Sequence, residues 1–183
     1  MVAGTRQGQR HHLVRRTGKG RQLISVELDK ASAFQALENA VQEYGEYWVD
    51  PNAGNEPCKN FYQHGEERRN CIAAKALLLI EPKLEPYILQ LSPGFTLKET
   101  VLELNVFSDV SISASDEALS ILSWAQVVQD AGVAWGSVFR ATCLAWEYRN
   151  QFNYRILIDE NGNVKLGSDT MSYAESNFSV IAV

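Results

Sequence analysis

The chain has 183 residues, of which 45% are hydrophobic, 21% charged and 10% aromatic. This composition is typical of a soluble globular protein and excludes a collagen-like, coiled-coil or wholly disordered chain. The longest uninterrupted apolar run, residues 76–80, is far shorter than the roughly 20 residues that a membrane-spanning helix needs. No apolar stretch follows the basic N-terminus, so we expect no signal peptide and a cytoplasmic protein.

Charge is divided unevenly along the chain. Residues 1–22 contain no acidic residue and six basic ones, which are Arg6, Arg10, Arg15, Arg16, Lys19 and Arg21. All 22 acidic residues follow, so residues 23–183 carry a formal charge of −11, although the whole chain carries only −5. We therefore predict a basic N-terminal arm, residues 1–22, attached to a single acidic domain, residues 23–183.

Three interpretations of the arm remain open. Clustered lysine and arginine side chains can neutralise the phosphates of DNA or RNA with little regard to base sequence. A segment this rich in glycine and charge can also remain a solvated tail, because it buries too little apolar surface to fold alone. It can finally fold back onto the acidic body of its own chain.

Hydrophobic spacing and capping residues predict the elements of the first half. Apolar alternation indicates a strand over residues 23–28, and a helix over 30–44 follows with Asp29 and Gly45 at its ends. Further predicted elements are a strand-like triplet at 47–49, a strand at 58–62 turned by His64-Gly65, and a helix at 71–80 capped by Asn70.

Prolines make residues 82–94 an irregular connector. The next segment, residues 97–106, is ambiguous: Thr96 and Glu99 form a capping box, which is typical of a helix start, yet the apolar residues also alternate as in a strand. Farther along are a helix between Ser115 and Gly132, a helix at 135–150, a hairpin of strands 152–158 and 164–166 turned tightly at Asn161-Gly162, and a last strand at 178–183. The predicted fold is α+β, with a mainly helical body, short strands and a C-terminal β-hairpin.

Cys58, His64 and Cys71 lie close together in the sequence. They could supply three zinc ligands, with Cys143, His11 or His12 as the fourth, but their spacing matches no common zinc motif. A Cys58–Cys71 disulfide is a second possibility, and packed structural thiols are a third. The balance favours structural cysteines, and we expect neither a metal nor another cofactor.

Catalysis by a cysteine is a further hypothesis. Cys71 stands near a predicted helix start, where the helix dipole and two preceding arginines would lower its pKa, and His64 could act as its base. Recognisable nucleotide-binding, EF-hand and hydrolase motifs are missing from the sequence. A non-enzymatic protein is therefore the main prediction.

Tryptophans recur at intervals of eleven residues, at Trp124, Trp135 and Trp146. Within the helix predicted at 135–150, Trp135, Phe139, Cys143 and Trp146 share one face. Such a face could stack nucleic-acid bases or bind a protein partner, but at helical spacing it is more often part of the core.

Two segments carry a resemblance to a known group. The first combines Tyr47, Cys58, Tyr62, Gly65, Cys71, Ile72, Ala76 and Leu77; the second combines residues 125–132 with Trp135-Gly136. Together they resemble an uncharacterised group of small actinobacterial and actinophage proteins over residues 37–142. The sequence departs from that group at Ala73-Ala74, where Val-Gly is usual. The resemblance implies a phage or mobile-element setting, in the host cytoplasm if the chain is phage-encoded, and no particular activity.

These observations predict a non-enzymatic accessory protein that binds nucleic acid, or a nucleic-acid-associated complex, through its basic arm. The alternative is a protein–protein adaptor or inhibitor that acts through an acidic surface. A small cysteine-dependent hydrolase built on Cys71 and His64 is the third hypothesis. No association with a membrane is expected.

Overall fold

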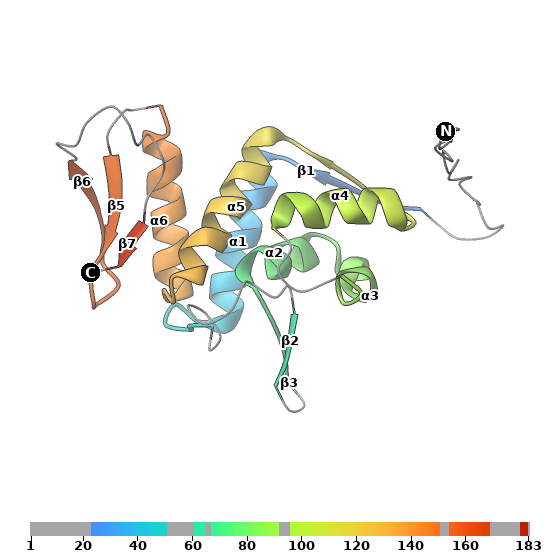
Figure 1. The fold of residues 1–183 in the computed structure, drawn as a ribbon, viewed down its shortest axis with the longest axis horizontal. Helices are drawn as coiled ribbons and strands as arrows, with labels where there is room; N and C mark the ends of the chain where they lie inside the picture. Colours follow the sequence, from blue (N-terminus) through green and yellow to red (C-terminus); the bar gives the residue numbers. More distant parts are fainter. Residues whose placement is uncertain are drawn as a thin grey trace, which may run out of the picture.

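The computed structural model describes residues 23–50, 61–64, 67–91, 96–150, 154–168 and 180–182. Its elements in chain order are β1 (Ile24–Leu28), α1 (Lys30–Tyr44), β2 (Phe61–His64), β3 (Glu67–Asn70), α2 (Ile72–Ile80), the 3₁₀ helix η1 (Pro82–Leu84), α3 (Glu85–Ile88), α4 (Leu97–Phe107), β4 (Val110–Ala114), α5 (Asp116–Asp130), α6 (Trp135–Tyr148), β5 (Tyr154–Ile158), β6 (Val164–Ser168) and β7 (Val180–Ala182). The predicted α+β fold with a mainly helical body and a C-terminal hairpin is confirmed (Figure 1).

Helices α1, α4 and α5 start at the capping residues found in the sequence. Asp29 and Ser32 form a reciprocal capping box at α1, and Thr96 and Glu99 form another at α4. Hydrogen bonds from Ser32 hold the pKa of Asp29 below its ordinary value, and those from Thr96 do the same for Glu99. The ambiguous segment after Thr96 is therefore a helix. Its capping box supplies hydrogen-bond partners for the backbone amides at the helix start, whereas a strand would need a neighbouring strand to supply them.

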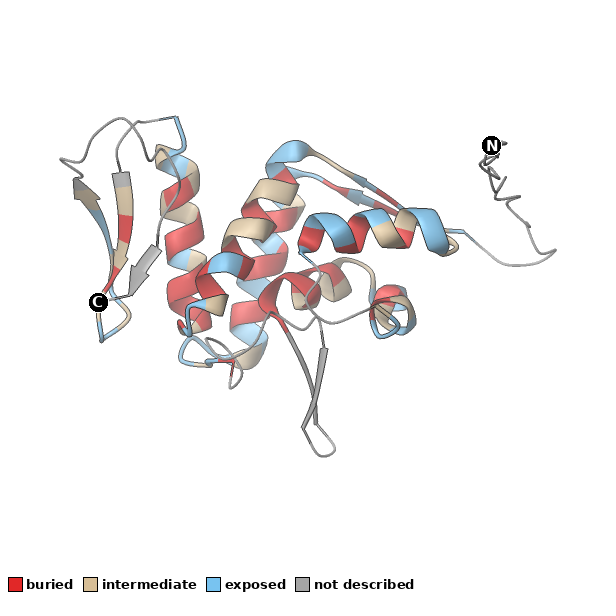
Figure 2. Cartoon of the chain, viewed as in Figure 1, coloured by how far each residue is buried: buried red, intermediate tan, exposed pale blue. Residues whose placement is uncertain are grey.

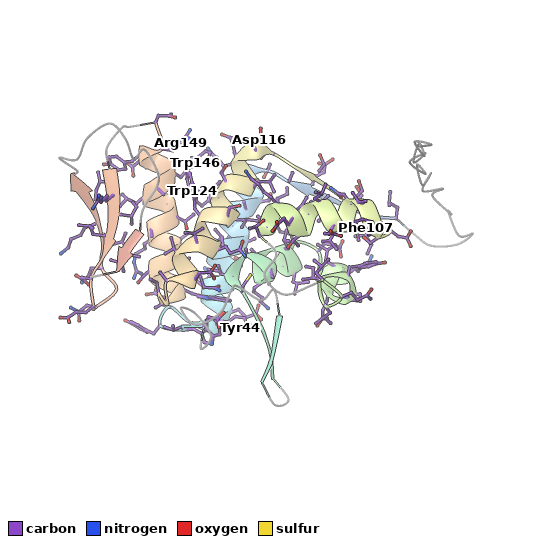
Figure 3. The ribbon with its side chains drawn as sticks, viewed as in Figure 1. Tyr44, Phe107, Asp116, Trp124, Trp146 and Arg149 are labelled. Carbon is purple, nitrogen blue, oxygen red and sulfur yellow. The ribbon has the colours of Figure 1, made fainter. Side chains whose placement is uncertain are left out.

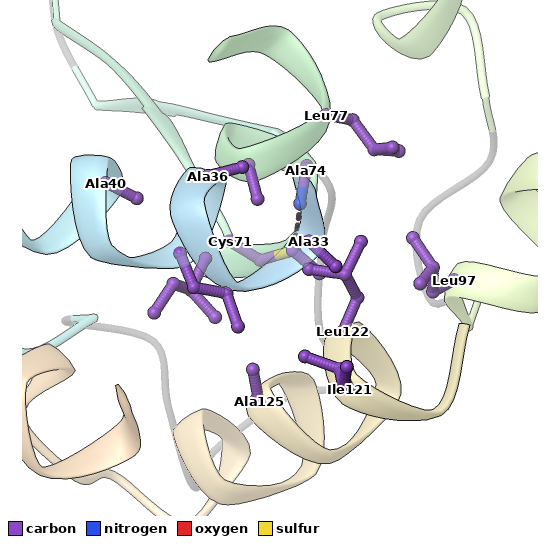
Figure 4. Close-up of a cluster of buried hydrophobic side chains, with 14 of the residues drawn as sticks. Ala33, Ala36, Ala40, Cys71, Ala74, Leu77, Leu97, Ile121, Leu122 and Ala125 are labelled. Carbon is purple, nitrogen blue, oxygen red and sulfur yellow. Dashed lines mark hydrogen bonds between the residues drawn. The ribbon is translucent and has the colours of Figure 1, made fainter. Parts of the chain in front are cut away.

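The centre of the core lies between helices α1, α2, α5 and α6, and α1 packs against each of the other three (Figures 1 and 2). Small side chains on α1, such as Ala33, Ala36 and Ala40, are fully or almost fully buried and allow α2 to approach closely. Figure 4 shows Ala33 and Ala36 beside Ala74 of α2, with Ala40 farther along α1. Burying this contiguous apolar surface is the main source of stability for a domain of this kind.

Helix α2 is apolar almost all round, as predicted for a helix buried on more than one side. Its residues 72–74, 76 and 77 are buried, and residues 78–80 are half-buried.

Three small sheets flank the helices. Strands β1 and β4 pair in parallel, and their apolar residues, such as Val26 and Ile112, face the core. The antiparallel hairpin β2–β3 projects from the helical body (Figure 1). At the C-terminal end β5 is the central strand, antiparallel to β6 and parallel to β7, and this sheet contacts α6.

Several sequence-based predictions need correction. Residues 47–49 form no strand; Glu46 and Tyr47 lie in a turn that follows α1. The connector after α2 is not wholly irregular, since it contains η1 and α3. Strand β4 was not predicted, whereas the turn predicted at Asn161-Gly162 is present, since the Gly162 N–H donates to the Asp159 carbonyl at 2.8 Å.

The predicted strand at 58–62 is displaced toward the C-terminus, because β2 runs over Phe61–His64; residues 58–60 lie outside the described residues. Within the part of the chain that the structure describes, no helix is long and apolar enough to cross a membrane.

Candidate functional site

Cys71 caps helix α2, where Asn70 had been predicted to do so. Asn70 is instead the last residue of β3, because it pairs with Phe61 across the hairpin. The Cys71 Sγ accepts a hydrogen bond from the Ala74 N–H at 3.3 Å, and the Cys71 side chain is completely buried. This thiol therefore has a structural contact that satisfies one of the free amides at the helix start.

The strand register does not bring His64 and Cys71 together. His64 pairs with Glu67, at the opposite end of the hairpin from the Phe61–Asn70 pair that precedes Cys71. Three residues of strand separate those two pairs by roughly 10 Å. A nucleophile and its base must approach to about 3 Å, so the described backbone gives the predicted dyad no support.

Of the remaining members of the predicted metal set, Cys143 alone lies within the described residues. Cys58, His11 and His12 lie outside the described residues. Cys143 is half-buried on α6, where burial and the nearby negative charge of Glu38 raise the pKa of its thiol. Among the described residues, no three or more His, Cys, Asp or Glu side chains are grouped as metal ligands.

The tryptophans divide into two separate clusters at the two ends of α6. At its N-terminal end Trp135 is fully buried, with ring centroids 4.8 Å from Tyr44 and 4.4 Å from Trp48. Backbone contacts close this end, since the N–H groups of Trp135 and Gly136 donate to the carbonyls of Trp48 and Glu46, both at 2.9 Å. The prediction of a core tryptophan is thus confirmed for Trp135.

At the C-terminal end of α6, Trp146 is only half-buried. Its ring packs edge-on against Phe34 of α1, with centroids 6.2 Å apart, and at a tilt against Trp124 of α5, with centroids 6.1 Å apart. Figure 3 shows Trp124 and Trp146 close to Arg149. The Arg149 guanidinium lies 3.9 Å from the ring centroid and the Lys30 Nζ lies 5.5 Å from it. We call these five residues the Trp146 cluster.

The Trp146 cluster joins half-exposed aromatic rings to exposed cations. Both Lys30 and Arg149 are exposed, and Arg149 is also held by a 2.7 Å hydrogen bond from its Nη1 to the Trp146 carbonyl. Rings of this kind can stack on bases or other planar groups, while the cations can contact phosphates. The structural alternative is a cation–π contact that simply covers the end of α6.

The glutamines of α5 have a structural role that the sequence analysis missed. The Gln129 Oε1 accepts a hydrogen bond from the Ile72 N–H, and Gln126 accepts one from the Leu97 N–H at 3.1 Å. The Gln129 amide also donates to the buried carboxylate of Asp50 at 3.2 Å. Each glutamine thus satisfies a free backbone amide at the start of a neighbouring helix. In the sequence, this role was indicated by two glutamines spaced three residues apart on an otherwise apolar helix face.

The segment 125–132 has a defined role in the packing of the helices. Gln126 and Gln129 lock α5 to the starts of α4 and α2. Both side chains therefore act as hydrogen-bonding partners inside the core.

The six basic arm residues, Arg6, Arg10, Arg15, Arg16, Lys19 and Arg21, lie outside the described residues. A separate exposed apolar strip lies on α4, where Leu102, Val106 and Phe107 are 62%, 52% and 70% exposed.

Comparison with known protein families, curated proteins and solved structures finds no match to this chain.

Proposed function

We propose that this protein binds nucleic acid, or a nucleic-acid-associated complex, as a non-enzymatic accessory protein in an actinobacterial or phage setting. Its contacts are the basic arm and the Trp146 cluster. The observation that carries the proposal is that cluster: a half-buried indole flanked by Arg149 at 3.9 Å and Lys30 at 5.5 Å, on a body with a formal charge of −11.

The chemistry of the cluster suits single-stranded segments better than duplex DNA. Aromatic stacking contributes about 1–3 kcal/mol per base and tolerates any sequence, because every base has a π-face. Trp124 and Trp146 come from different helices, and their rings lie next to each other with centroids 6.1 Å apart. The cations beside them are placed to contact the backbone phosphates that flank a stacked base.

The arm supplies the second contact. Its six positive charges on 22 residues contrast with the acidic body, and phosphate contacts from such a segment add affinity that is largely independent of sequence.

The adaptor function remains the second candidate, and one observation favours it. Leu102, Val106 and Phe107 leave an apolar strip exposed on α4, with Glu99 and Glu103 on the same helix. Contiguous exposed apolar side chains are typical of protein-binding surfaces. A partner that binds there would be a protein with an apolar, positively charged contact surface.

The two candidates are separated by fluorescence anisotropy with labelled single-stranded DNA and RNA at low salt. Trp146→Leu should weaken binding by about tenfold, because one stacking contact is lost. The matched control Leu102→Ser should bind like the wild type. Failure of the full-length protein to bind any nucleic acid at low salt would contradict the proposal, and capture of a protein that Leu102→Ser abolishes would favour the adaptor.

A further inference from the structure

The two-stranded sheet of β1 and β4 has two unlike edges. The backbone groups of Ile24, Val26 and Leu28 face β4; for example, the Ile24 N–H donates to the Asp109 carbonyl at 3.0 Å. On the far side of β4, the Asn105 side chain imitates a further strand. Its Oδ1 accepts from the Ile112 N–H at 2.6 Å and its Nδ2 donates to the Ile112 carbonyl at 3.0 Å. The β4 edge is therefore closed at its centre.

The opposite edge, on β1, is open. Because backbone groups alternate along a strand, the N–H and C=O groups of Ser25 and Glu27 face away from β4. Neither residue has a backbone hydrogen-bond partner on that side within the described part of the chain, and both are exposed. Open strand edges bind other strands unless they are blocked, and among the described residues such a block is found on β4 and not on β1.

We propose that the open edge of β1 pairs antiparallel with β1 of a second copy of this chain, centred on Val26. In this register Ser25 lies opposite Glu27 of the second copy, and the two exchange backbone hydrogen bonds. Val26 then lies opposite Val26, and Ile24 opposite Leu28, so the apolar faces of the two sheets continue into each other. The result is a four-stranded sheet, β4–β1–β1–β4, with a two-fold axis at Val26.

Charge and pattern favour a second copy as the occupant. The Val26-centred register sets Glu27 against a serine, whereas a register centred on Glu27 would set two carboxylates against each other. Strand β1 has the alternating Ile, Val and Leu residues of a good strand. The arm is a poorer candidate, because its adjacent apolar residues Leu13 and Val14 would point to opposite faces of a sheet.

If the arm and the Trp146 cluster both contact nucleic acid, as proposed above, the pairing brings these two contacts together. In the Val26-centred register, residue 23 of one copy lies opposite Asp29 of the other, and Lys30 of the Trp146 cluster follows directly. The arm of one copy would therefore begin beside the Trp146 cluster of the other. Dimerisation would join the two nucleic-acid contacts, which β1 of a single chain holds roughly 20 Å apart.

Sedimentation equilibrium of the full chain, without nucleic acid, tests the dimer independently of the proposed function. Ser25→Glu should weaken dimerisation by roughly 2- to 30-fold, because it sets a carboxylate against Glu27 at two symmetric positions. The double variant Ser25→Glu, Glu27→Ser should restore it, because the pair is only exchanged. Ser111→Glu is the matched control, since Ser111 is the exposed β4 residue beside Ser25 and does not lie on the open edge.

Hydrogen exchange at the Ser25 and Glu27 amides gives a second readout. Protection that rises with protein concentration, and survives deletion of residues 1–22, supports the dimer. Protection that is independent of concentration and lost on that deletion would mean that the arm occupies the edge and would overturn the proposal. A chain that is monomeric at all concentrations, or a dimer that Ser25→Glu does not weaken, would overturn it as well.

Discussion

The two tryptophans at the ends of α6 share a helix but differ in environment. Trp135 is fully buried between Tyr44 and Trp48, whereas Trp146 is half-buried and has two cations against its ring. The difference arises from what faces each end: the segment after α1 closes over Trp135, and the surface remains open at Trp146. A shared helical face therefore does not imply a shared role, and only the open end can contact a ligand.

The largest expected effect is on stability at the buried end. Trp135→Ala should lower the free energy of unfolding by about 3–5 kcal/mol, because it removes a completely buried ring and leaves a cavity. Trp146→Ala should lower it by less, about 2–3 kcal/mol, since part of that side chain is already exposed. Urea denaturation of both variants measures the difference, and equal losses would contradict the distinction between the two ends.

A smaller loss is expected where the segment after α1 closes over the helix. A Cβ at position 136 would lie 2.9 Å from the Glu46 carbonyl oxygen, so Gly136→Ala should cost about 1–3 kcal/mol and expose Trp135 to quenchers. In an unobstructed helix the same change would stabilise the protein by up to about 1 kcal/mol. A stabilised Gly136→Ala variant would show that this contact does not close the buried end.

Removing a cation from the open end should scarcely change stability. Arg149→Ala and Lys30→Ala should each cost about 0.5–1 kcal/mol, the value of an exposed cation–π contact, and should each weaken nucleic-acid binding. Arg149→Lys is the matched control, because it keeps the positive charge beside Trp146 but loses the planar guanidinium that lies over the ring. A strongly destabilised Arg149→Ala with unchanged binding would make the cluster purely structural.

The smallest effect concerns Cys143, between the two ends of α6. Burial and Glu38 raise the pKa of its thiol, so at pH 8 it should react with iodoacetamide more slowly than an exposed cysteine. Glu38→Gln removes the nearby negative charge, so it lowers the pKa of the Cys143 thiol and should speed the reaction. The rate should rise by less than about tenfold if the pKa falls by less than about one unit. An unchanged rate would show that burial alone governs the thiol.

The features that could be predicted from the sequence are local. The helix starts at Asp29 and Ser115 follow from side chains that bond to amides three residues away. The capping box at Thr96 is equally local, but the strand-like alternation after it left that segment undecided from the sequence. The hairpin of β5 and β6 followed from alternation and from the turn signal at Asn161-Gly162.

The features that were missed depend on distant partners. Strand β4 is short and is stabilised by pairing with β1, far earlier in the chain. Cys71 replaces Asn70 as the cap because hairpin pairing uses Asn70 in β3. For the candidate site, spacing placed Trp135 and Trp146 on one face, but which of them stays open depends on the segment after α1, and no local pattern reveals that.

Salt-dependent binding to nucleic acid tests the central claim most directly. If about four of the six arm charges contact duplex phosphates, the logarithm of the association constant should fall with the logarithm of salt concentration with a slope near −4. Arg15→Ala with Arg16→Ala should reduce that slope by about two. With single-stranded DNA, Trp146→Leu should weaken binding at every salt concentration and leave the slope unchanged, because stacking releases no counterions. No binding at low salt, or a Trp146→Leu variant that binds like the wild type, would contradict the account.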